Sequence, residues 1–140
     1  MSIMRRKSLL LACHGSMAVE FALIGSVFLM VILGIVQGGL LLWAKAAIEE
    51  SASRAARCTA ITSSYCTDPA AYVSTLLNGW GVSGIVPSVS VSVASGTTCN
   101  NTAGHFSLVT VKSTGPVLSN ILPAFSNIVL SSSSCYPSGI

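Results

Sequence analysis

The longest apolar stretch of the chain runs from Phe21 to Trp43 and contains no charged residue. Gln37 is its only strongly polar side chain. At about 1.5 Å of rise per residue, a helix of this length extends roughly 35 Å, enough to cross a hydrocarbon core of about 30 Å. The pattern therefore predicts a membrane-spanning helix. Glu20 lies directly before the stretch, where a carboxylate is costly in lipid and is often functional.

Beyond the apolar stretch, the helical pattern continues to about Cys58. Small and apolar residues recur there every three or four positions and define one narrow face: Ala44, Ile48, Ala52 and Ala55. Glu50 and Arg54 on the same segment are spaced for a favourable ion pair. The small-residue face suits packing against another helix or against the rest of the chain, although a solvated alanine-rich helix has the same pattern.

The remainder of the chain predicts a small domain. Asp68 and Pro69 are typical of a helix N-cap and first helical residue, and apolar positions at helical spacing extend this short helix to about Asn78. The following segments predict three strands and two connections: strands at Val89–Val93, Phe106–Lys112 and Asn127–Ser132, a loop at Ser95–Gly104 and an irregular segment at Thr114–Phe125. A three-stranded antiparallel meander backed by the short helix hides both apolar faces. The expected fold class is α+β, with a long N-terminal membrane-spanning helix.

The chain contains five cysteines, of which Cys13 precedes the apolar stretch. The other four predict two disulfides and an oxidising compartment: Cys58, Cys66, Cys99 and Cys135. In the meander, the loop that holds Cys99 and the end of the third strand fall on the same edge. Of the three connectivities that four cysteines allow, we therefore expect Cys58–Cys66 and Cys99–Cys135. No metal site is expected, because there is no Cys-x-x-Cys pair and His105 is the only later histidine.

Charge is concentrated near the N-terminus. The formal net charge is +3, and Arg5, Arg6 and Lys7 lie among the first 15 residues. Without these three, the seven basic residues fall to four against four acidic ones, so no nucleic-acid partner is expected. Because basic residues that flank a span stay in the cytoplasm, we expect the N-terminus there and the C-terminal part outside.

Residues 1–15 are expected to be a targeting leader, which can be interpreted in three ways. A secretory signal peptide needs a small-residue cleavage site after its apolar part, and none occurs before the span is complete. The string Leu10-Leu11-Ala12-Cys13 is similar to a lipobox, in which Cys13 would carry the lipid. The third interpretation is a prepilin leader, which is short and basic and ends in a glycine, here Gly15.

Longer strings support the third interpretation. Gly15-Ser-Met-Ala-Val-Glu20-Phe21 resembles the cleavage motif of type IV prepilins and pseudopilins. The strings AVEFALIG, GIVQGG and ESASRAARCTA resemble, more narrowly, the TadE-like family of Tad/Flp pilus assembly pseudopilins. The resemblance covers Gly15 to about Ala60. That family often has a proline soon after VEFAL, where this chain has Gly25-Ser26, so the local bend is expected to differ.

The resemblance implies how the N-terminal residues act. A prepilin peptidase would cut between Gly15 and Ser16, which leaves a new cationic amine on Ser16. Glu20, followed by Phe21, would pair with the amine of a neighbouring subunit during assembly. The implied partners are the peptidase, other pilins or pseudopilins, and the inner-membrane assembly platform.

Inside the span, Gly34 and Gly38 form a GxxxG groove that allows another helix to approach closely. Gln37 beside it is placed to hydrogen-bond across such an interface, which contributes about 1 kcal/mol at most. The groove is the expected surface for lateral helix packing.

These features predict a leader at 1–15, a helix at 16–58 that includes the span 21–43, and an exported domain at 59–140. The expected function is that of a minor pseudopilin, in the bacterial inner membrane, that helps to assemble a Tad/Flp type IV pilus. The alternative is an uncleaved signal-anchored module that binds a ligand or surface in the periplasm. No enzyme activity, catalytic residue, cofactor or small-molecule substrate is expected. The reason is that no carboxylate follows Asp68, and no nucleophile elbow, phosphate loop or dinucleotide fingerprint occurs.

Overall fold

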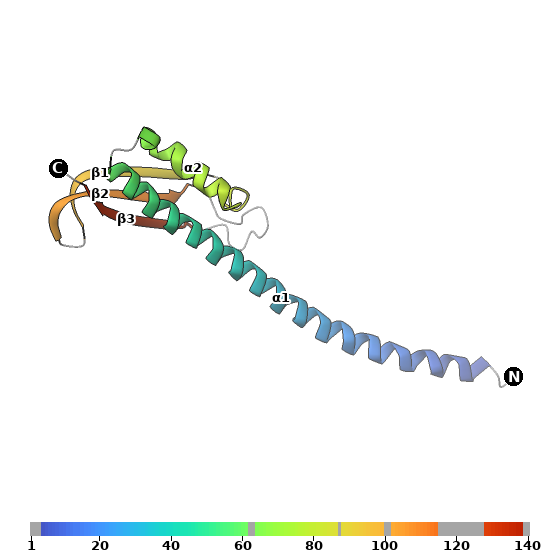
Figure 1. The fold of residues 1–140 in the computed structure, drawn as a ribbon. Coiled ribbons are helices and arrows are strands. Elements are labelled where there is room, and N and C mark those ends of the chain that lie inside the picture. The colour runs from blue at the N-terminus through green and yellow to red at the C-terminus, as the bar shows by residue number, and fades with distance from the viewer. Residues whose placement is uncertain (1–3, 62–63, 87, 100–101, 115–127, 139–140) are drawn as a thin grey trace. The chain divides into compact units, whose positions relative to one another are not determined.

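The structure, a computed structural model, describes residues 4–61, 64–86, 88–99, 102–114 and 128–138. The elements are α1 (Met4–Ala60), the 3-10 helix η1 (Ser64–Cys66), α2 (Pro69–Gly79), β1 (Val89–Cys99), β2 (Thr102–Ser113) and β3 (Ser131–Pro137), as Figure 1 shows. The predicted α+β class is confirmed: a long apolar helix is followed by a short helix and a three-stranded antiparallel sheet. The chain divides into a first unit, Met1–Gly39, and a second unit, Leu40–Ile140.

The first unit is formed by the N-terminal part of α1. Its apolar side chains are exposed, among them Phe21 at 80% and Met30 at 75%. In the part of the chain that the structure describes, α1 is the one helix long and apolar enough to cross a membrane, judged by length and composition. An exposed apolar surface of this extent marks a contact with lipid or with other proteins.

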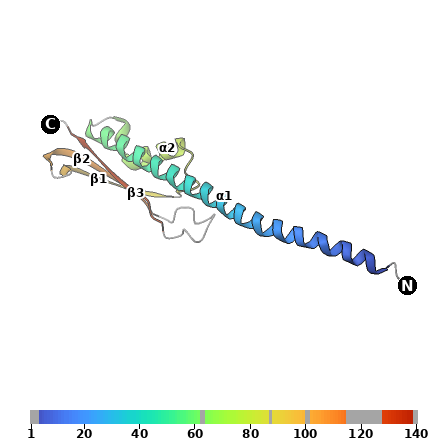
Figure 2. The same ribbon diagram turned by 90° about the horizontal axis from the view of Figure 1, so that it is seen from below.

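The core of the second unit forms where the C-terminal part of α1 meets α2 and β2. The buried residues of α1 are nearly all small: Ala44, Ala47, Ile48, Ser51, Ala52, Ala55 and Ala56. They pack with Val73 and Leu77 of α2 and with Val109 and Val111 of β2. Figures 1 and 2 both show this part of α1 lying along the strands. The predicted small-residue face therefore contacts the rest of the chain, because small side chains let a helix backbone come close to its neighbours.

Local signals determine where α2 begins and ends. The side chain of Asp68 accepts hydrogen bonds from the backbone N–H groups of Ala70 at 3.0 Å and Ala71 at 3.2 Å. Pro69 occupies the first helical position, where an N–H has no helical partner. Beyond the helix, Gly81 has a φ of 69°, a conformation that glycine adopts without steric penalty. The predicted short helix is observed where the sequence places it.

The sheet has the order β1-β2-β3 with antiparallel pairing throughout. The predicted loop at Ser95–Gly104 is wrong, because β1 and β2 stay paired as far as Cys99 and Thr102. Register shifts on either side of Thr97 bend this long hairpin. The residues at the end of β1 and the start of β2 are mostly polar and show no alternation of apolar and polar side chains. Backbone hydrogen bonds hold them in the strands, so the side-chain pattern does not reveal the pairing.

The third strand is displaced from its predicted position. The sequence predicts Asn127–Ser132, whereas β3 begins at Ser131 and pairs with β2 as far as Pro137 opposite Phe106. The prediction is wrong because β3 is serine-rich and alternates between exposed and half-buried side chains, without an apolar face. Asn127 and residues 115–125 of the predicted irregular segment lie outside the described residues.

Ser51 is a polar residue in the core of the second unit. It is 0% exposed, and its Oγ has no hydrogen-bond partner among the residues described. We expect Ser51→Ala to raise the free energy of unfolding by about 1 to 2 kcal/mol. An unsatisfied buried hydroxyl is destabilising, and alanine is the better helix former. Urea denaturation of the full-length protein in detergent micelles, followed by tryptophan fluorescence, measures the change.

Ser53 provides the control for this substitution, because it lies on the same helical turn and is exposed. Ser53→Ala should give only the gain in helix propensity, about 0.5 kcal/mol. A gain from Ser51→Ala that does not exceed the gain from Ser53→Ala would contradict the prediction.

Candidate functional site

The expected cleavage point, between Gly15 and Ser16, lies within α1, and both residues are exposed. A Cβ atom added to Gly15 would meet no heavy atom within 4 Å, so no packing contact of the described chain requires glycine there. Glycine destabilises a helix interior by about 1 kcal/mol relative to alanine. The position is therefore accessible, and its glycine is not explained by the fold.

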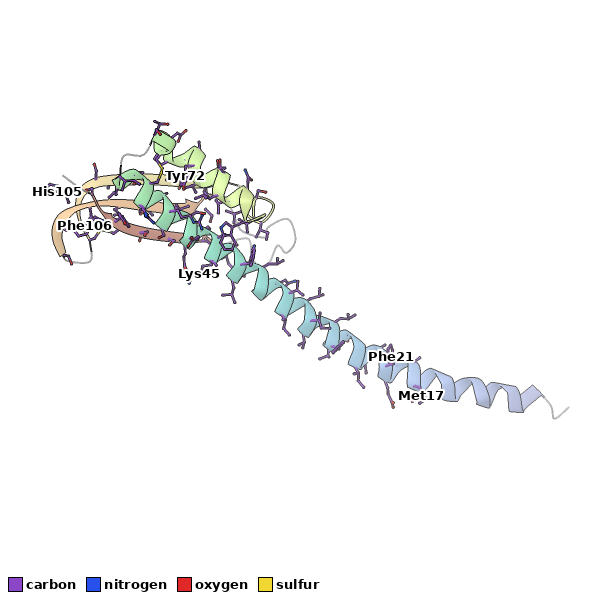
Figure 3. The ribbon with its side chains drawn as sticks, in the orientation of Figure 1. Met17, Phe21, Lys45, Tyr72, His105 and Phe106 are labelled. Atoms are coloured by element: carbon purple, nitrogen blue, oxygen red, sulfur yellow. A yellow bond between two sulfur atoms is a disulfide. The ribbon has the colours of Figure 1, made fainter. Side chains whose placement is uncertain are left out.

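Glu20 lies one helical turn after Ser16, so the two residues share a face of α1. Both are exposed, and no ion pair of Glu20 occurs among the described residues. Phe21 projects away from the helix, as Figure 3 shows. Within the first unit, the carboxylate and the neighbouring ring are thus both open to a partner.

Gly34 and Gly38 also lie one turn apart on α1. A Cβ atom at either position would meet nothing within 4 Å, so the described chain does not fill the groove between them. Exposed apolar side chains flank the groove, including Ile35 at 69% and Val36 at 53%. This is the geometry that allows two apolar helices to approach closely.

Two disulfides are present, between the same pairs that the sequence predicts. Cys58–Cys66 joins the end of α1 to η1, with 6.0 Å between the Cα atoms. Cys99–Cys135 joins β1 to β3, with 6.3 Å between the Cα atoms. Because β2 lies between these two strands, a shared sheet edge does not explain the second pair. Instead, the bent tip of the β1–β2 hairpin brings Cys99 to β3.

A groove of about 930 Å³ lies between α2 and the C-terminal part of α1. Charged and aromatic side chains contribute to its lining: Glu50, Arg54, Arg57, Tyr72 and Tyr136. Arg54 Nε donates to Glu50 Oε1 at 2.6 Å, and this hydrogen-bonded ion pair raises the pKa of Arg54. The spacing of the two residues predicts the ion pair. It does not predict the groove, because Tyr72 and Tyr136 come from distant parts of the chain.

Two further polar residues, Asp68 and His105, lie outside the groove between α1 and α2. Asp68 caps α2, as described above, and His105 is exposed on β2. Within the described ranges, no three His, Cys, Asp or Glu residues lie together in a way that could hold a metal ion.

Residues 15–57 match the family model of TadE-like proteins. The matched segment starts at the glycine of the expected cleavage site and lies within α1, so it includes neither α2 nor the sheet. The resemblance carried by AVEFALIG, GIVQGG and ESASRAARCTA is thereby confirmed over these residues. No curated protein and no solved structure matches the chain.

Proposed function

We propose that this chain, which is TadE-like over residues 15–57, is a minor pseudopilin that takes part in assembling a Tad/Flp type IV pilus. A prepilin peptidase removes the leader, α1 holds the mature protein in the inner membrane, and lateral packing of α1 joins it to other pilins. One observation carries the proposal: the family match lies on a helix whose apolar side chains are exposed along the first unit.

The leader is residues 1–15, and cleavage after Gly15 frees the amine of Ser16. The exposure of both residues supports this step, as does the lack of any packing contact that would require glycine. A glycine lets the backbone adopt conformations that a peptidase site needs and that other residues resist.

Glu20 then guides docking to a neighbouring subunit. An unpaired carboxylate at the centre of a span costs about 2.5 to 3.5 kcal/mol on insertion scales, less near the interface, so pairing with an amine is favoured in lipid. Ser16 and Glu20 lie four residues apart, about 6 Å along the helix axis, so a shift of about one turn between neighbouring subunits brings the amine of one to the depth of the carboxylate of the next. The groove at Gly34 and Gly38 lets the two helices approach further along the span.

The proposed orientation places the N-terminus in the cytoplasm and the second unit in the periplasm. Arg5, Arg6 and Lys7 precede the span, and basic flanks stay on the cytoplasmic side. The disulfides Cys58–Cys66 and Cys99–Cys135 lie beyond the span, in agreement with an oxidising compartment there.

The mature N-terminus tests this proposal directly. It is measured by intact mass of the membrane-extracted protein, from cells with and without prepilin peptidase. The wild-type chain should start at Ser16 only where the peptidase is present, and Gly15→Leu should remain unprocessed. Gly25→Leu is the matched control, because its added side chain also meets no atom of the described chain near Cβ. It should be processed like the wild type.

Two other results would redirect the assignment. A start at Met1 or Ser2 in both strains would contradict processing and favour the uncleaved signal-anchored module. In that case, the groove between α1 and α2 is the surface to examine for ligand binding. A start at Cys13 with added acyl mass would favour a lipoprotein.

A further inference from the structure

Two tryptophans from distant parts of the sequence meet in the second unit. Trp43 is the last residue of the apolar stretch that begins at Phe21, and Trp80 directly follows α2. Their ring centroids are 5.2 Å apart in an edge-to-face arrangement. Trp43 Nε1 also donates a hydrogen bond to the backbone oxygen of Trp80, at 3.3 Å. Such aromatic pairs contribute about 0.5 to 1.5 kcal/mol beyond the burial of their surface.

The turn that carries Trp80 is held firmly in place. The backbone N–H of Val82 donates to the oxygen of Leu77 at 3.3 Å, and that of Val86 donates to the oxygen of Val82 at 2.9 Å. Leu77 before Trp80 is 5% exposed and Val82 after it 0%, so both ends of the turn are anchored in the core. The position of Trp80 relative to Trp43 is therefore set by the fold of the second unit.

The surface around the two indoles is mostly uncharged, and its one charged contributor is Arg54 of α1, which lines the same hollow as Trp43 and Trp80 in the described part of the chain. No charged residue occurs between Asp68 and Lys112, so α2 and the turn after it carry no charge. Trp43 is 51% exposed and Leu42 beside it 70%, so exposed apolar surface lies next to the tryptophan pair within the second unit. Lys45 follows two residues later with an exposed side chain, which pairs loosely with Glu49 at 3.7 Å.

The contact between the rings limits the depth of Trp80 in a membrane to within about 5.2 Å of the depth of Trp43. On the proposed function, α1 spans the bilayer and Trp43 ends the span in the headgroup layer, which is about 5 to 7 Å thick on each side. A separation of 5.2 Å between the rings does not exceed the thickness of that layer. We propose that Trp80 is a second interfacial anchor, which with Trp43 seats the C-terminal end of α2 in the lipid headgroup layer.

This inference rests on the proposed span of α1, but it makes a separate claim. A span alone requires only that Trp43 lie at the interface, and it leaves α2 free to stand away from the lipid. Trp80 in the headgroup layer would tie the second unit to the membrane surface at two points, at α1 and at the end of α2.

The two tryptophans are the only ones in the chain, so fluorescence can follow each of them alone. Trp80→Phe leaves Trp43 as the reporter, and Trp43→Phe leaves Trp80. Each full-length variant is reconstituted at high dilution into vesicles of phosphatidylethanolamine and phosphatidylglycerol. Lipids brominated near the glycerol backbone, lipids brominated near the chain end, and iodide in the aqueous phase serve as quenchers. The unmutated chain is measured in parallel, which guards against disturbance of the pair by substitution.

We expect the shallow lipid quencher to act on Trp80 to within about twofold of its effect on Trp43, with little effect of the deep quencher on either. In the unmutated chain, the combined emission of the two residues should respond to the quenchers as it does in the single-tryptophan variants. Quenching of Trp43 by shallow lipid while Trp80 is quenched only by iodide would overturn the inference and leave the span intact. If lipid quenches neither residue, the span itself is wrong. A third outcome concerns association of the protein with itself. If no quencher reaches Trp80 at the first dilution, but quenching appears when the protein is diluted further in lipid, then a second copy of the chain covers Trp80. That result would overturn the assignment to lipid.

Discussion

Replacing Cys99 and Cys135 together by serine is expected to lower the free energy of unfolding of the second unit by about 4 kcal/mol. The two residues are 36 positions apart, so their bond removes much of the conformational freedom of the unfolded chain. In the folded state, the bond connects the outer strands β1 and β3 through the bent hairpin tip. Cys99 is only 7% exposed, so serine there also places a hydroxyl in a nearly closed environment. Urea denaturation of the full-length protein in micelles, followed by tryptophan fluorescence, gives the difference.

The second disulfide supplies the comparison. Cys58 and Cys66 are only 8 positions apart, and the same chain-entropy relation gives about 2.5 kcal/mol for the loop that they close. Replacing both by serine should therefore destabilise the unit less than the loss of Cys99–Cys135 does. The reverse order, or equal losses, would show that native contacts at α1 and η1 outweigh the entropy of the unfolded chain.

Glu20→Leu is expected to reduce the amount of pilin incorporated into surface fibres by about tenfold or more. A tenfold loss corresponds to about 1.4 kcal/mol of free energy lost from the docking of this chain to a neighbouring subunit. On the proposed function, the substitution leaves the Ser16 amine of a neighbouring subunit without a counter-charge in the membrane. Leader cleavage should continue, because Gly15 and Ser16 are unchanged. The measurement is an immunoblot of sheared surface fibres, with the intact mass of the membrane fraction as a check on processing.

Glu49→Leu is the matched control for the loss of a carboxylate on α1. Glu49 is exposed and pairs only loosely with Lys45, at 3.7 Å, and an exposed pair of this kind contributes less than about 1 kcal/mol. This variant should assemble normally. Normal assembly of Glu20→Leu would instead assign Glu20 a local role at the start of the span, in the headgroup layer and near the helix dipole.

Short-range patterns in the sequence were sufficient for the helices. The uncharged stretch from Phe21 to Trp43 predicted a long apolar helix, and Asp68 with Pro69 predicted the start of α2. The string VEFAL and its neighbours indicated the family that the match to residues 15–57 supports. These features depend on residues within one or two helical turns of each other, so the residues themselves carry the information.

The strands show where short-range patterns fail. Alternating valines predicted the start of β1, but its polar continuation to Cys99 and the serine-rich β3 were missed. Both segments are strands because their backbone groups pair with β2, and a neighbouring strand supplies that pairing whatever the side chains are. A pattern that reads only side chains cannot detect it.

By itself, therefore, the sequence determined the long helix, the short capped helix, the α+β class and the TadE-like segment. Only the tertiary structure decided which surface the alanine face of α1 covers, why Cys99 reaches Cys135, and that Trp80 lies against Trp43. Each of these contacts joins residues far apart in the chain. Its formation depends on the free energy of the whole fold, which offsets the entropy of closing the intervening loops.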